Sequence, residues 1–209
     1  ECLQGGCPVT HIRVRDRDAA EALAEESELE ITGVCYDSRQ VRPGDLFVAV
    51  PGFAADGHRF IPMALENGAA AVLCEKAPAE GAYIQTPSTR TALAQVSANW
   101  FGDPASGMKL IGVTGTNGKT TVTTVLKEVL ERTLGAKVGL IGTIHNEIGD
   151  QIIPTERTTP ESFELQQLLR RMADAGCQYV IMEVSSHAIA LDRVAGLHFA
   201  VGAFTNLTE

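Results

Sequence analysis

The chain has 209 residues, a formal net charge of −9, 44% hydrophobic residues and 21% charged residues. Its length and composition are those of a globular protein with one large or two small domains. The negative charge would repel a phosphodiester backbone, so we exclude nucleic acid as a partner. No apolar run approaches the ~20 residues that span a bilayer, and no basic-then-apolar leader opens the sequence, so we expect no membrane insertion. The five cysteines contain no CxxC pair, which favours free thiols in a reducing cytoplasm.

Residues 1–104 are predicted to form a first domain of short strands and helices. Apolar runs predict strands at 30–36, 45–50, 70–75 and 82–86, and helices at 58–68 and 89–101. The acidic run at 25–30 is typical of a solvated face. "GDPASG" (102–107) has the composition of a linker, so a new domain is expected to begin near it.

Residues 105–209 alternate between strands and helices. Strands are predicted at 109–113, 137–143, 179–184 and 199–204, with runs that are apolar on both faces. Two segments between them have apolar residues at helical spacing and are predicted to be helices. These residues are Val122, Val125, Leu126, Val129 and Leu130 in the first segment, and Leu165, Leu168, Leu169, Met172 and Ala173 in the second. This alternation predicts an α/β domain with a mainly parallel sheet flanked by helices, which binds ligands at the carboxyl ends of its strands.

A glycine-rich turn joins the first strand and helix of this second domain. The stretch "VTGTNGKTTV" (113–122) has Val113 where the strict phosphate-loop pattern has glycine, but it lies between a strand and a helix. The amides of 116–120 and the helix N-terminus would hold phosphates, Lys119 would neutralise the outer ones, and the Thr120 hydroxyl would bind Mg²⁺. The alternative is a structural glycine turn. The predicted ATP-binding residues are Gly115, Thr116, Asn117, Gly118, Lys119, Thr120 and Thr121.

Glu183 is the second candidate, near the carboxyl end of an otherwise apolar strand. A buried carboxylate needs a cation, because leaving it unpaired costs several kcal/mol. If this strand lies close to strand 109–113, Glu183 faces Thr120 and would be a Mg²⁺ ligand. The alternative is a solvent-exposed acid at a strand end.

Other polar residues follow the predicted strands, and each has an ordinary structural alternative. "RTTPES" (157–162) would start a helix, with Thr159 as its N-cap. Arg193 is either a surface arginine or a phosphate clamp. Asp37-Ser38-Arg39 is typical of a turn.

Four segments together resemble the Mur ligase family of peptidoglycan synthesis, and within it the MurE type. They are "TGVCYDSRQVRPGDLFVAVPGFAADGHRFIPMALENGAAAVL", "GVTGTNGKTT", "TTPES" and "EVSSHAIALDRVAGLHFAVGAFTNLTE". The resemblance implies an ATP-dependent amide-bond ligase of the bacterial cytoplasm. It would add diaminopimelate or L-lysine to UDP-N-acetylmuramoyl-L-alanyl-D-glutamate through an acyl phosphate, with ATP and Mg²⁺ as cofactors.

The resemblance also implies roles for individual residues. Lys119 and Glu183 would be catalytic, and Thr120 and Glu183 would hold Mg²⁺. The first domain would hold the UDP-linked substrate through Ser38 and Arg39. The second domain would contact it through Thr158, Thr159, Ser185 and Arg193.

The family pattern continues beyond "TNLTE" with an Asp-His metal element, a carbamylated lysine and a third domain that binds the amino acid; none of these occurs in this sequence. We therefore expect the second domain to be incomplete, and this chain to be inactive in ligation on its own. We also expect it to be a monomer.

Other interpretations remain open. A MurF-type ligase shares the Asp-Ser-Arg segment, and a non-catalytic nucleotide-binding module would keep the phosphate loop. Folylpolyglutamate synthase lacks the uridine-binding first domain, so residues 31–86 argue against it. A GTPase would need an NKxD segment, which the sequence lacks.

Overall fold

The computed structural model describes residues 11–14, 17–18, 29–52 and 55–208. It divides into two compact units, one ending at Leu93 and the other beginning at Ala94, within helix α3 (Thr89–Trp100). The predicted domain boundary at 104–105 stays a prediction. The predictions made for Cys2, Cys7 and most of the acidic run at 25–30 lie outside the described residues.

A sheet with the strand order β2-β1-β6-β5-β4-β3 forms the described part of the first unit. Strands β3 to β6 pair in parallel, whereas β1 pairs antiparallel with both β6 and β2. The four strands predicted here are all observed, with shorter bounds. The strands are β1 (His11–Val14), β2 (Arg17–Asp18), β3 (Gly33–Cys35), β4 (Asp45–Val48), β5 (Ala71–Cys74) and β6 (Tyr83–Gln85).

The predicted helix at 58–68 is a 3₁₀ turn, η1 (Gly57–Phe60), followed by α2 (Ile61–Glu66). Ile61 and Ala64 face the sheet, where they join a buried cluster that includes Phe47 and Val72. Gly68 follows the helix with a φ of +97°, a conformation that glycine adopts without the steric cost of a Cβ.

The second unit is built on a mixed sheet with the order β10-β9-β8-β11-β7-β12. The four predicted strands are observed and pair in parallel, which confirms the α/β prediction. The antiparallel hairpin β9–β10 was not predicted. The strands are β7 (Lys109–Thr114), β8 (Val138–Ile141), β9 (Asn146–Ile148), β10 (Gln151–Ile153), β11 (Tyr179–Glu183) and β12 (Phe199–Phe204).

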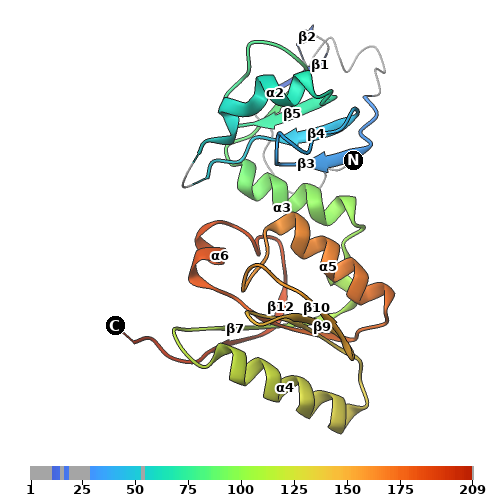
Figure 1. Cartoon of the computed structure of the whole chain (residues 1–209), viewed down its shortest axis with the longest axis vertical. Coiled ribbons are helices and arrows are strands. Elements are labelled where there is room, and N and C mark those ends of the chain that lie inside the picture. The colour runs from blue at the N-terminus through green and yellow to red at the C-terminus, as the bar shows by residue number, and fades with distance from the viewer. Residues whose placement is uncertain (1–10, 15–16, 19–28, 53–54, 209) are drawn as a thin grey trace. The chain divides into compact units, whose positions relative to one another are not determined.

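Helices cover both faces of this second sheet. Helix α4 (Lys119–Leu134) lies on one face, and α5 (Ser162–Asp174) lies on the other (Figure 1). The short elements are η2 (Pro104–Gly107) and α6 (Ser186–Ala190). Two buried clusters result. One joins Leu165, Leu169 and Met172 of α5 to β11, and the other joins Leu126 and Leu130 of α4 to strands that include β11.

The two long helices differ in how well the apolar spacing predicted their buried face. In α5 the predicted residues Leu165, Leu168, Leu169 and Met172 are buried. In α4 the face is rotated, because Val122, Val125 and Val129 are exposed, while Thr123 and Lys127 are buried. The helix at this position is confirmed, but three of its predicted apolar positions do not face the sheet.

No helix within the described residues is long and apolar enough to cross a membrane.

Candidate functional site

The glycine-rich loop connects β7 to α4 as predicted. Gly118 precedes the helix with a φ of +85°, and Gly115 has a φ of +128°. A Cβ at Gly115 would lie 2.8 Å from the carbonyl oxygen of Asn206, so both conformation and space require glycine there. The amides of Thr116 and Asn117 donate to the backbone and side-chain oxygens of Asn206, at 2.9 and 3.1 Å. These two amides therefore bond the segment after β12 in this structure.

Lys119 and Thr120 form the first turn of α4. The Lys119 Nζ donates to the carbonyl oxygens of Gly115 and Thr116, at 2.7 and 3.2 Å, so the ammonium lies across the loop. The Thr120 hydroxyl points to β11 and donates to Glu183 Oε1 at 3.0 Å. This contact confirms the prediction that Glu183 faces the Thr120 end of the loop.

Glu183 ends the central strand of the sheet, between β7 and β8, and it is only 1% exposed. Its register partner on β7 is Val113, the residue that begins the predicted phosphate loop. The alternative of a solvent-exposed acid is therefore wrong. Within the described part of the chain Glu183 forms no ion pair, and its side-chain partners are neutral donors. A buried carboxylate in these surroundings fits a cation.

Thr143 supplies two further donors to the Glu183 carboxylate, and sequence reasoning missed it. Its amide donates to Oε1 at 3.0 Å, and its hydroxyl donates to Oε2 at 3.1 Å. The preceding residue must be small, because a Cβ at Gly142 would lie 2.7 Å from Oε1. The available signal was position: Thr143 is the last residue of the predicted strand 137–143, at the edge where ligands bind.

Thr158, Thr159 and Ser185 also gather at this edge. The Thr159 hydroxyl donates to the Glu183 carbonyl oxygen at 2.8 Å and accepts from the Ser185 amide at 3.1 Å. The Thr158 and Thr143 hydroxyls lie 3.0 Å apart. The Ser185 hydroxyl accepts from the Ala188 amide and caps α6.

The predicted N-cap role of Thr159 is wrong. Helix α5 begins at Ser162 and its N-cap residue is Glu161, while Thr159 is 1% exposed and bonds β11 instead. The loop folds back onto the strand, and the buried hydroxyl satisfies the last carbonyl of β11.

Arg193 is an internal arginine, so its surface alternative is wrong. Its side chain is 14% exposed and forms an ion pair with Glu161 at 2.7 Å. It also donates to the Thr159 carbonyl oxygen at 3.1 Å. Its Nε is buried and has no partner among the described residues. Arg193 therefore fixes the loop that carries the two threonines.

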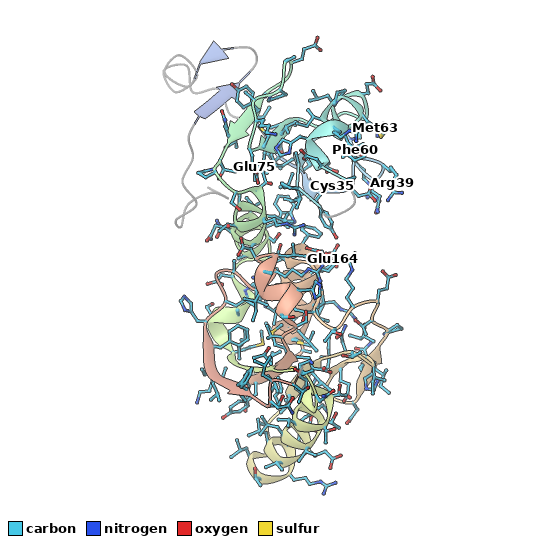
Figure 2. The ribbon with its side chains drawn as sticks, turned by 90° about the vertical axis from the view of Figure 1, so that its left-hand side faces the viewer. Cys35, Arg39, Phe60, Met63, Glu75 and Glu164 are labelled. Atoms are coloured by element: carbon cyan, nitrogen blue, oxygen red, sulfur yellow. The ribbon has the colours of Figure 1, made fainter. Side chains whose placement is uncertain are left out.

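Ser38 and Arg39 lie in the first unit. Ser38 is buried; its hydroxyl contacts the Met63 sulfur at 3.5 Å, and its carbonyl accepts from Asn67. Arg39 extends from the surface with 80% of its side chain exposed (Figure 2). It donates to Asp37 through Nε and Nη2 at 2.9 and 2.8 Å, and these bonds hold the pKa of Asp37 far below its usual value. Residues 37–39 therefore form a local polar turn, as predicted.

A charged network fixes α4 to the strand β9. The Lys127 Nζ lies 3.0 Å from Glu131 and 3.0 Å from Glu147, and His145 contacts Glu147 at 2.7 Å. Burial alone would raise the pKa of Glu147, but the bonds from Lys127 and His145 outweigh it and lower that pKa. Burial would lower the pKa of Lys127, but its two carboxylate partners raise it. The helix that carries Lys119 and Thr120 is thus held partly by charge.

The chain is similar to known proteins over both units. Family models match it twice: "Mur ligase family, catalytic domain" at residues 30–100 and "Mur ligase middle domain" at residues 113–209. A UDP-N-acetylmuramoyl-L-alanyl-D-glutamate–2,6-diaminopimelate ligase of Bacteroides fragilis is 54% identical over 191 residues, covering 90% of this chain and 39% of the relative. The same-named ligase of Clostridium botulinum is 48% identical over 194 residues, covering 90% of this chain and 40% of the relative.

A solved structure of a ligase with this name superimposes with a TM-score of 0.76 and 28% identity, over 86% of this chain and 37% of the other. The chain thus spans about two fifths of the length of these curated relatives.

Proposed function

Because this chain belongs to the Mur ligase family, we propose that it forms the part of a peptidoglycan-precursor ligase that binds the UDP-linked substrate and ATP. The ligase would join 2,6-diaminopimelate to UDP-N-acetylmuramoyl-L-alanyl-D-glutamate, as the names of its relatives say of those proteins. The observation that carries the proposal is one contact. The phosphate-loop residue Thr120 and the buried Glu183 meet at 3.0 Å, on the edge where Thr158, Thr159 and Ser185 also lie.

In the proposed reaction, ATP phosphorylates the substrate carboxylate and the incoming amine displaces phosphate to form the amide. Lys119 would bind the outer phosphates, and residues 115–121 would surround them with amides and a helix N-terminus. The amides of Thr116 and Asn117 would have to exchange Asn206 for phosphate oxygens.

Mg²⁺ would be held by Thr120 and Glu183. Magnesium prefers oxygen ligands, and these two residues supply a hydroxyl and a carboxylate at the end of the loop. The buried Glu183 has neutral donors as its described side-chain partners, and this supports a cation there. A bound Mg²⁺ would neutralise phosphate charge.

Thr158, Thr159, Ser185 and Arg193 would contact the muramoyl-peptide on the same edge. Arg193 donates to the Thr159 carbonyl oxygen of this loop, and its Nε, which is buried and has no partner among the described residues, supports a role in binding an anionic group. Ser38 and Arg39 would hold the uridine nucleotide in the first unit. The guanidinium of Arg39 is exposed, so it is accessible to a phosphate group. Its hydrogen bonds to Asp37 orient it.

Selection of diaminopimelate and the complete ligation are proposed for the whole ligase, since this chain covers two fifths of its relatives. That this chain alone is inactive, and that it is a monomer, remain predictions. We assign the reaction to the bacterial cytoplasm because two of the three proposed substrates, ATP and the UDP-linked precursor, are nucleotides.

Calorimetry with two UDP-linked ligands tests the proposed substrate. UDP-N-acetylmuramoyl-L-alanyl-D-glutamate should bind more tightly than the corresponding UDP-tripeptide, which a MurF-type ligase would prefer. Thr159→Ala should weaken this binding, whereas Thr133→Val, on the exposed side of α4, should not. Binding of neither ligand would overturn the proposed substrate and favour a module with another ligand.

A non-hydrolysable ATP analogue with Mg²⁺ tests the nucleotide site. Lys119→Met should weaken its binding by at least roughly tenfold, because a charge-assisted contact to phosphate is lost. Glu183→Gln should reduce the dependence of binding on Mg²⁺. Lys109→Met, at the exposed start of β7, is the matched control and should bind as the wild type does. Equal binding by the Lys119 variant and this control would contradict the assignment.

A further inference from the structure

Thr143 is the residue at which the candidate cation ligand and a candidate substrate contact meet. It touches Glu183 through its amide and its hydroxyl, and the same hydroxyl touches Thr158. The roles proposed above for Glu183 and Thr158 make no use of Thr143.

The direction of these hydrogen bonds follows because each threonine hydroxyl has only one hydrogen to donate. An ionised carboxylate only accepts, so the hydroxyl proton of Thr143 goes to Glu183 Oε2 at 3.1 Å. A hydroxyl has one proton, and that of Thr143 is now committed. Across the 3.0 Å contact between the two hydroxyls, Thr158 must therefore donate and Thr143 must accept.

We propose that Thr143 is a positioning residue that fixes the Glu183 carboxylate and turns the Thr158 hydroxyl into a hydrogen-bond acceptor for the substrate. The inference rests on the proposed function, because it assigns Glu183 to the nucleotide-bound cation and Thr158 to the UDP-linked substrate. The Thr158 hydroxyl donates its hydrogen bond to Thr143, so it can only accept a hydrogen bond from a ligand. The group that it binds must be an N–H or O–H donor, such as a peptide amide or a sugar hydroxyl.

Gly142 and the burial of Glu183 support a fixed arrangement. The carboxylate is 1% exposed, and a methyl group at residue 142 would lie 2.7 Å from its Oε1. Gly142 therefore leaves the space that Oε1 occupies, and the two donors of Thr143 hold both oxygens of the carboxylate. Loss of the Thr143 hydroxyl would remove the hydrogen bond to Oε2. It would also leave the Thr158 hydroxyl without the acceptor that orients its hydrogen.

The chain of donors predicts an asymmetry between two valine variants. Thr143→Val should weaken binding of both the Mg²⁺–ATP analogue and UDP-N-acetylmuramoyl-L-alanyl-D-glutamate, each by roughly tenfold. Thr158→Val leaves the bond between Thr143 and Glu183 in place. It should weaken only the UDP-linked ligand and leave the nucleotide within about twofold. Thr143→Ser, which keeps the hydroxyl, should restore both affinities.

Calorimetry of each ligand separately, with thermal unfolding of every variant, measures these outcomes. Thr133→Val is the control for the same chemical change on an exposed helix surface. If the wild type binds neither ligand, the proposed function fails. If the wild type binds both ligands and Thr143→Val binds them with unchanged affinities, the inference fails.

Two further results would also overturn the inference. One is a Thr143→Val variant with a lower melting temperature and unaltered affinities, which would mean a purely structural role. The other is a Thr158→Val variant that loses nucleotide binding as strongly as Thr143→Val. If Thr143→Val fails to fold, Thr158→Val still decides: weaker nucleotide binding by Thr158→Val than by the wild type and Thr143→Ser would overturn the inference.

Discussion

Helices α4 and α5 cover opposite faces of one sheet, yet they are held to it by different forces. Helix α5 packs through leucine and methionine side chains that are fully or almost fully buried. Helix α4 buries Thr123 and Lys127 beside the half-buried Leu126 and Leu130, and leaves three valines exposed. The helix that carries the phosphate-loop residues is therefore fixed by hydrogen bonds and charge as well as by apolar contact.

The difference shows how hydrogen bonds and ion pairs can offset the cost of burying a polar residue. The Thr123 hydroxyl donates to the carbonyl oxygen of Thr120 at 3.0 Å, which satisfies it within the helix. Lys127 buries its aliphatic stem and reaches two carboxylates with its ammonium. Apolar spacing alone identifies a helix here but misplaces its inner face.

The largest effect is expected in α5. Leu169→Ala removes a fully buried side chain from the cluster under β11 and should lower the free energy of unfolding by about 2–5 kcal/mol. Urea unfolding measures it. A loss below about 1 kcal/mol would mean that apolar packing does not dominate this face.

A smaller loss is expected in α4. Lys127→Met leaves Glu131 and Glu147 without their common cation and should cost about 1–3 kcal/mol, less than for a fully buried pair because both carboxylates keep some exposure. Lys76→Met, at an exposed position, is the control. If the two variants are equally stable, the charged network does not hold α4.

The charged face should also respond to acid, with a still smaller effect. Glu147 has a folded-state pKa below its ordinary value of 4.5, so its contribution is present above that value and is lost as the pH falls through the folded pKa. Between about pH 6 and about pH 3, the wild type should lose more stability than Lys127→Met does. Parallel loss in the two proteins would argue against this origin.

The smallest effect is expected on the outer stripe of α4, which consists of the exposed Val122, Val125 and Val129. Val125 is 56% exposed, so Val125→Ser should change the free energy of unfolding by less than about 0.5 kcal/mol. Thermal unfolding beside Leu169→Ala makes the comparison direct. A cost near that of the leucine variant would show that the stripe is covered in solution.

The α/β architecture and the meeting of Thr120 with Glu183 were predictable, because alternation of apolar strands and helices sets which strand ends share an edge. Thr143 was not predicted, because a threonine at a strand end is common and its partner lies far away in the sequence. The hairpin β9–β10 was missed because its strands are short and partly polar, although Gly149, with a φ of +57°, and Asp150 form a two-residue turn between them. The fold-back of Thr159 depends on tertiary contacts, so a local capping rule misread it.

The alternation of side chains along β11 links its chemistry to its packing. Val180 and Met182 point into the cluster beneath α5, and Ile181 points into the cluster on the α4 side. Glu183 shares the parity of Ile181 and so reaches Thr120. A slip of β11 by a single residue would drive the carboxylate into hydrocarbon and present a valine or a methionine to the loop. The hydrophobic residues of this strand therefore set the position of Glu183, and a mutation among them can displace this acid from Thr120 without changing any polar group.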